Sequence, residues 1–164
     1  MSITATPGAS ANSYISVEAA NDYFHTRMHS EPWAAADVYS RNKALTTATR
    51  ILDGMAWCGL KSDSANSLRW PRSGVLDKDG YTLSSSTIPS FLEQATADLA
   101  LDLLVEDASK ANPQAIAPLK KAKLGALEAE WAVSEPEEEN TIQSGVRVLI
   151  GFYLAAQGHR ILRA

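Results

Sequence analysis

Apolar side chains recur at spacings of three and four residues in four stretches of the chain, which is the spacing that places them on one face of an α-helix. The first stretch follows Ser16, a residue type that caps helices by accepting a hydrogen bond from a free backbone N–H. We expect this helix to end at Glu31-Pro32, because a proline disfavours helix in the residue before it. The second stretch predicts a helix from Asp37 to about Trp57, with Gly59 as its left-handed stop.

The third predicted helix begins at Ile88-Pro89, where a proline in the first turn costs no intrahelical hydrogen bond. Phe91 and Leu101 make it apolar on more than one side, so we expect it to be buried against several neighbours or against another subunit. The fourth predicted helix opens at Asn140, with Gln143 three residues later as in a capping box. Gly158 is expected to close it.

Two stretches have the pattern of extended chain. Residues Leu127–Val133 alternate between apolar and acidic or small side chains, which predicts a half-buried strand, although their Ala, Leu and Glu content leaves a helix open. The residues after Trp70-Pro71-Arg72 predict a short extended excursion closed by a turn at Asp79-Gly80. The expected fold is therefore mainly α, a small bundle of about four helices with short β excursions.

Composition narrows the classes of protein. The 164 residues are 45% apolar and 21% charged with a net charge of −4, which is typical of a globular protein and argues mildly against generic duplex binding. The single cysteine, Cys58, suits a reducing compartment. The longest apolar run, Val148–Ala156, is far shorter than the roughly 20 residues of a membrane-spanning helix, and no secretion signal is evident. We expect a soluble intracellular protein, with residues 1–13 as a loosely held, flexible arm.

The residues that could carry catalysis do not form a recognisable set. His25 and His29 have the four-residue spacing of a zinc pair, but Thr26 replaces the glutamate of the zinc-protease motif. Asp77-Lys78-Asp79-Gly80 resembles part of a calcium loop without its remaining oxygen ligands, and a surface turn explains it better. Cys58 is most simply a small core residue. We therefore expect no enzyme activity, no metal and no cofactor.

A nucleic-acid role has slightly more support. Trp70 could stack on a base of a single strand, and Arg69 and Arg72 could contact its phosphates. A short basic run at Lys120, Lys121 and Lys123 adds charge, whereas the acidic segment Ser134–Asn140 would repel phosphates.

The chain resembles the tailed-phage head–tail connector (adaptor) proteins, many of which carry the label "DnaT-like single-stranded DNA-binding protein". The most specific matches are the block Trp70-Pro71-Arg72-Ser73-Gly74-Val75, the following Asp79-Gly80, and Ile88-Pro89. Weaker matches lie elsewhere along the chain: Asn12-Ser13-Tyr14-Ile15-Ser16, Ala48-Thr49-Arg50, Asp53, Trp57, Lys123, Gly125, Tyr153-Leu154 and Arg163-Ala164. The chain departs from the family pattern at Asn66-Ser67 and at Phe152.

This resemblance implies a virion structural protein, present in the host cytoplasm before assembly and in the neck of the particle afterwards. It implies one helical adaptor domain over residues 14–158 that forms a ring of about twelve copies beneath the portal protein. A tail-side neck or tail completion protein would be the other neighbour. DNA would pass through the ring without sequence-specific binding, and no membrane is involved. The alternative is a single-stranded DNA-binding accessory protein of replication.

Two segments are the expected interface with the portal or with neighbouring subunits. Trp70 and Pro71 are expected to anchor the long loop before the third helix by packing into the core, with Arg72 presented to an acidic residue of its own chain or of a neighbour. The second segment is residues 159–164, which we expect to be a docking tail with apolar side chains between basic ones; the alternative is that it folds back onto its own domain. The resemblance implies that this tail reaches the portal, by adding to a sheet edge or by inserting apolar side chains into a groove. Its expected contact residues are Arg160, Ile161, Leu162 and Arg163.

Overall fold

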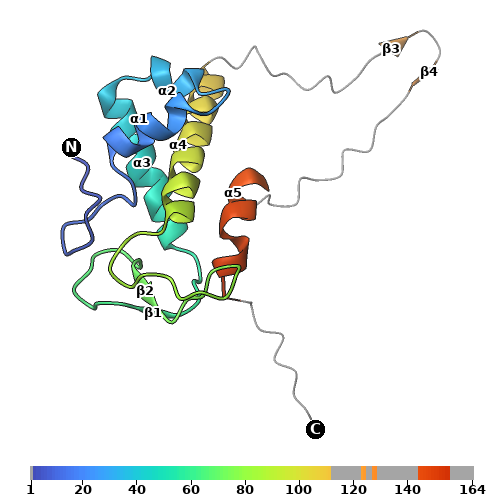
Figure 1. Ribbon diagram of the computed structural model, residues 1–164. Coiled ribbons are helices and arrows are strands. Elements are labelled where there is room, and N and C mark those ends of the chain that lie inside the picture. Colours follow the sequence, from blue (N-terminus) through green and yellow to red (C-terminus); the bar gives the residue numbers. More distant parts are fainter. Residues whose placement is uncertain (1, 112–122, 125–126, 129–143, 156–164) are drawn as a thin grey trace.

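A computed structural model describes residues 2–111, 123–124, 127–128 and 144–155. The protein is mainly helical, with only short strands, as the sequence predicts (Figure 1). The helical elements are α1 (Val17–His25), α2 (Glu31–Ala35), α3 (Val38–Asp53), α4 (Ser90–Ala111), α5 (Ser144–Ile150) and the 3₁₀ turn η1 (Gly151–Tyr153).

Helix α4 lies at the centre of the bundle. It packs mainly against α3 and α5, and α1 and α2 cover it at one end (Figure 1). Leu92 and Leu99, seven residues apart, share one face of the helix and Leu101 lies on another, yet all three are buried. The expectation of a helix surrounded by several neighbours is therefore confirmed, and a large part of the apolar area that stabilises the fold is buried around α4.

Local capping explains where α1 and α3 begin. The Ser16 hydroxyl accepts a hydrogen bond of 3.1 Å from the Ala19 backbone N–H, and the Asp37 carboxylate accepts one of 2.8 Å from that of Ser40. The Ser16 cap is where the sequence predicts it, and Asp37, expected as the first residue of the second helix, is the N-cap of α3. These bonds satisfy backbone donors that have no partner inside the helix.

Two predicted helix ends are wrong. Glu31-Pro32 opens α2 instead of ending α1, because a proline in the first turn of a helix needs no N–H partner. Helix α1 ends earlier, at His25. Helix α3 stops at Asp53 with Gly54 as its C-cap, so Trp57 and Gly59 lie in the following loop.

The strands are two residues long each. Strand β1 (Leu60–Lys61) pairs antiparallel with β2 (Arg72–Ser73), and β3 (Lys123–Leu124) pairs with β4 (Leu127–Glu128). Of the predicted strand Leu127–Val133, only β4 falls within the described residues, and the predicted start at Asn140 and stop at Gly158 of the last helix lie outside them.

The excursion after β2 is confirmed. Leu76 and Thr82 form an isolated antiparallel bridge, and the Asp77 carboxylate accepts hydrogen bonds from the backbone N–H groups of Asp79 (3.0 Å) and Tyr81 (2.7 Å). The side chain of Asp77 therefore organises the turn that Asp79-Gly80 closes.

The segment before α1 lies against the domain. The Asn12 side chain accepts a hydrogen bond of 2.8 Å from the Thr4 N–H, and the Ser67 hydroxyl donates to backbone oxygens of residues 8 and 11. Ser13 and Tyr14 are fully buried. Where we expected a loosely held arm, residues 8 and 11 accept hydrogen bonds from Ser67 in the loop that precedes Trp70, and Asn12 holds the segment together.

None of the helices in the described part of the chain combines the length and the apolar character that crossing a membrane requires.

Candidate functional site

Trp70 is the centre of an aromatic cluster inside the domain. Its side chain is 1% exposed, and its ring meets Trp57 and Phe91 edge to face at centroid distances of 5.5 and 5.7 Å. Phe91 in turn stacks on Tyr153 at 3.8 Å. Pro71, joined to Trp70 by a cis peptide bond, is also fully buried. The predicted core anchor is confirmed, and in this conformation the Trp70 indole offers no surface for stacking on a base.

Arg72 is occupied by backbone oxygens of its own chain. Its Nε donates to the Cys58 carbonyl at 2.6 Å and its Nη2 to the Gly59 carbonyl at 2.5 Å. Longer bonds reach the carbonyls of Trp57 (3.4 Å) and Arg69 (3.3 Å). Burial, with a smaller contribution from the positive charge of Arg69, lowers the pKa of the Arg72 guanidinium. Among the described residues no acidic side chain forms an ion pair with Arg72, and the expected acidic partner, on its own chain or on a neighbour, stays a prediction. The guanidinium instead ties β2 to the loop that follows α3.

Asp53 connects the N-terminal segment to the same loop. Its carboxylate accepts a hydrogen bond from the Tyr14 hydroxyl and one of 2.6 Å from the Arg69 backbone N–H. Burial and the adjacent carboxylate raise the pKa of Tyr14 well above its ordinary value of 10.0. The structure brings together, in one scaffold, residues from different stretches of the family resemblance. They are Tyr14, Asp53, Trp57, Trp70 and Arg72.

We call residues 56–83 and 151–155 the loop end. A bridge between Trp57 and Leu154, together with backbone hydrogen bonds from Cys58 to Tyr153 (3.0 Å) and from Ala155 to Ala56 (2.9 Å), joins its two parts. In Figure 1 it forms the end of the molecule opposite α1 and α2. Its large exposed apolar side chains are Leu60, Leu76, Tyr81 and Phe152, which are 52–75% exposed.

A single glycine allows the close contacts of the loop end. Gly59 has a φ of 72°, and a Cβ placed on it would lie 2.6 Å from Cγ2 of Val75 and would also clash with the Ser73 carbonyl oxygen. A side chain at this position would force the loop and β2 apart.

The structure also shows where the histidines and the cysteine considered in the sequence lie. His25 and His29 are both exposed, and the described residues contain no group of three or more His, Cys, Asp or Glu side chains that could hold a metal ion. Cys58 is only half-buried, so it lies at the edge of the core rather than within it. Lys120, Lys121 and the tail residues Arg160, Ile161, Leu162 and Arg163 lie outside the described residues.

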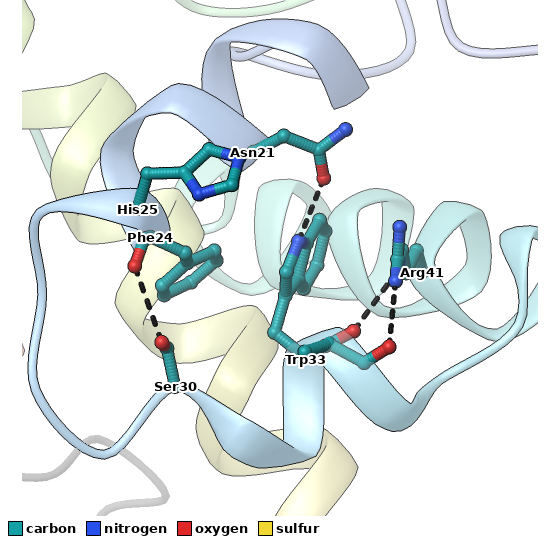
Figure 2. A pocket seen from close by; sticks show the side chains of 7 residues that line it. Asn21, Phe24, His25, Ser30, Trp33 and Arg41 are labelled. Atoms are coloured by element: carbon teal, nitrogen blue, oxygen red, sulfur yellow. Dashed lines mark hydrogen bonds between the residues drawn. The ribbon is translucent and has the colours of Figure 1, made fainter.

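Two further features were not evident from the sequence. The first is a hollow of about 280 Å³ at the junction of α1, α2 and α3, which Figure 2 shows from close by. Its lining residues are Asn21, Phe24, His25, Ser30, Trp33, Ala34 and Arg41. They come from three elements, so no single stretch of sequence reveals it.

The second feature is an exposed stripe on α3. Tyr39, Lys43 and Arg50 follow at helical spacing on its exposed face, and the Lys43 ammonium lies 4.2 Å from the centre of the Tyr39 ring. The spacing of an aromatic and two basic residues on the polar side of a predicted helix is the signal that could have revealed it.

The described fold is small and mainly α-helical, with a loop scaffold that is held together by hydrogen bonds within the chain. The chain matches, over residues 1–164, the family described as "Putative DnaT-like ssDNA binding protein", and it belongs to that family. The description names single-stranded DNA and no virion component, so it favours the alternative expectation over the connector. A comparison with curated proteins finds no match, and a comparison with solved structures finds none either.

Proposed function

We propose that the protein is a structural adaptor that joins the portal of a phage capsid to the tail, and that its loop end and C-terminal tail form the portal-facing surface. The observation that carries this proposal is the internal use of Trp70 and Arg72. Trp70 is buried and Arg72 binds carbonyls of its own chain, so both side chains stabilise the loop end instead of facing a ligand. The most specific block of the family resemblance therefore maintains the shape of a surface.

The exposed side chains of the loop end favour a protein as the binding partner. Four large apolar side chains are exposed at the loop end, whereas its arginines are committed to backbone carbonyls. Exposed apolar surface of this kind is typical of protein–protein contacts. A phosphate backbone would instead require several accessible cations along its path, and the exposed Lys78 of the loop end lies between Asp77 and Asp79.

The tail would start from this surface. Ala155, the last described residue, donates a backbone hydrogen bond to Ala56, so the described part of the chain ends at the loop end. Ile161 and Leu162 would then enter an apolar groove or follow a sheet edge of the portal, with Arg160 and Arg163 meeting acidic groups there. A ring of copies would surround the DNA, and the net charge of −4 would limit its adhesion.

The test is removal of residues 159–164 from the full chain. The truncated protein should unfold at the same urea concentration as the intact protein, but should no longer co-sediment with portal rings or complete particles. A matched variant with Ile161→Ser and Leu162→Ser keeps the length and charge of the tail and should behave like the truncation. Normal portal binding by both variants would contradict the role of the tail, and absence of the intact protein from purified virions would contradict the adaptor itself.

Single-stranded DNA binding is the second candidate, which the family description supports directly. The structure offers the α3 stripe for it, since a base could stack on Tyr39 while Lys43 and Arg50 meet phosphates. Binding of labelled oligothymidine should then weaken steeply with salt, and a Tyr39→Ala, Lys43→Gln variant should lose it at least about tenfold. Trp70→Phe is the control that leaves the stripe intact. Salt-independent or absent binding would exclude this candidate.

A further inference from the structure

We propose that the hollow between α1, α2 and α3 is an anchor site for one carboxylate side chain, a glutamate or aspartate, of a protein partner. The hollow lies away from the loop end, so this inference does not rest on the proposed function.

The acceptor groups around the hollow are already occupied. The Asn21 side-chain oxygen accepts a hydrogen bond of 2.9 Å from the Trp33 indole, and the carbonyls of Trp33 and Ala34 accept bonds of 2.9 and 3.0 Å from Arg41 (Figure 2). The Phe24 carbonyl accepts a bond of 3.1 Å from the Ser30 hydroxyl. A ligand therefore finds few acceptors here.

The groups that remain free are mainly donors. Within the described part of the chain, no hydrogen bond engages the Asn21 amide nitrogen, the His25 imidazole or the Arg41 Nη1 nitrogen. His25 is exposed at the rim, one helical turn after Asn21 on α1. Donors of this kind, two of them on groups that can carry positive charge, select an anionic group rich in acceptors.

The size and walls of the hollow favour a side chain as its occupant. About 280 Å³ is slightly smaller than the sites that hold drug-sized ligands. Ala34, which is exposed, supplies apolar contact for the methylene groups of a glutamate, while the Nη1 nitrogen of Arg41 can donate to its carboxylate.

A nucleic-acid strand fits less well. The rings of Phe24 and Trp33 are 4% and 3% exposed, so no base could stack on them. The exposed carboxylates of Asp22 and Glu31, each adjacent in sequence to a lining residue, would repel the successive phosphates of a strand. A single carboxylate on an apolar stem avoids that repulsion by entering the hollow.

The test uses the full chain labelled with ¹⁵N and the Trp33 indole N–H signal, assigned from a Trp33→Phe variant. N-acetyl-glutamate N-methylamide should shift this signal in a saturable way at millimolar concentration, and the matching glutamine compound should bind at least about fivefold more weakly. His25→Gln should weaken binding of the glutamate compound about three- to fivefold. His29→Gln, which changes an exposed histidine that does not line the hollow, should leave it unchanged.

Three results would overturn the proposal. They are a Trp33 signal that does not saturate, equal binding of the glutamate and glutamine compounds, and equal effects of the His25 and His29 substitutions. Saturation of the same signal by inorganic phosphate or oligothymidine at lower concentration than the glutamate compound would also overturn it, because it would assign the hollow to a phosphate.

Discussion

Replacing Arg72 with lysine distinguishes two possible roles of this residue. In one its guanidinium holds the fold together by hydrogen bonds, and in the other its positive charge contacts DNA. Lysine keeps the positive charge but has a single donor nitrogen, so it cannot replace the separate Nε and Nη donors that lie around the edge of the guanidinium. If Arg72 holds β2 to the loop after α3, the substitution destabilises the domain. If Arg72 binds phosphates, lysine should largely preserve its role.

The expected loss follows from the two short bonds, to the carbonyls of Cys58 and Gly59 at 2.6 and 2.5 Å. Hydrogen bonds to a charged group contribute about 1.5–3 kcal/mol each, and lysine can retain one of them. The side chain is only partly buried, so solvent screens part of this energy. We therefore expect Arg72→Lys to lower the free energy of unfolding by about 1–2 kcal/mol, which corresponds to a decrease in Tm of roughly 2–8 °C for a chain of this size.

Urea denaturation followed by tryptophan fluorescence measures this loss, with Arg50→Lys as the control. Arg50 is exposed on α3, and its substitution should change the free energy of unfolding by less than about 0.5 kcal/mol. A stability of Arg72→Lys within 0.5 kcal/mol of the intact protein, at an unchanged denaturant slope, would refute the structural role that the geometry assigns to Arg72.

Three further predictions concern the same scaffold, each measured as the free energy of unfolding. Trp70→Ala should cost about 3–5 kcal/mol. Trp70→Phe should cost less than half of that, because the buried indole nitrogen has no hydrogen-bond partner in the described structure; equal costs would contradict the packing role. Gly59→Ala should lower the free energy of unfolding more than Gly74→Ala does, since both glycines have φ near +70° but only Gly59 of the two lacks room for a Cβ. Equal losses of stability would mean that the backbone conformation alone, and not the close contact, causes the effect. Tyr14 stays neutral in the folded protein, so its contribution to stability is complete below pH 10.0 and is lost as pH rises above that value. Tyr14→Phe should remove that part of the alkaline decline, and an unchanged pH profile would contradict it.

Local signals made the starts of α1, α3 and α4 predictable to within about two residues, whereas α2 was not predicted. Ser16 and Asp37 cap α1 and α3 through side chains a few residues from the backbone groups they bind, so the sequence contains both partners. The helix ends failed where two local rules compete. Pro32 is compatible both with the end of one helix and with the start of the next, and packing of Trp33 into the core favours the second.

The partners of Arg72 and the walls of the hollow could not be predicted. Arg72 binds backbone carbonyls 3 to 15 residues away, and a carbonyl carries no residue type that a pattern could reveal. An acidic partner was therefore the natural expectation from side chains alone. Arg41 poses the same difficulty, since its acceptors are the carbonyls at the end of α2.

The bridge between Trp57 and Leu154 also has a consequence for the order in which the domain forms during synthesis. The helices α1 to α4 can emerge from the ribosome and begin to pack while the aromatic cluster around Trp70 still lacks Tyr153, and while the backbone groups of Ala56 and Cys58 still lack their partners. Contacts between residues so distant in sequence close late, because the entropy of a long loop opposes them. The loop end would then be the last part of the nascent protein to mature, so an incompletely synthesised subunit would present an unfinished surface there.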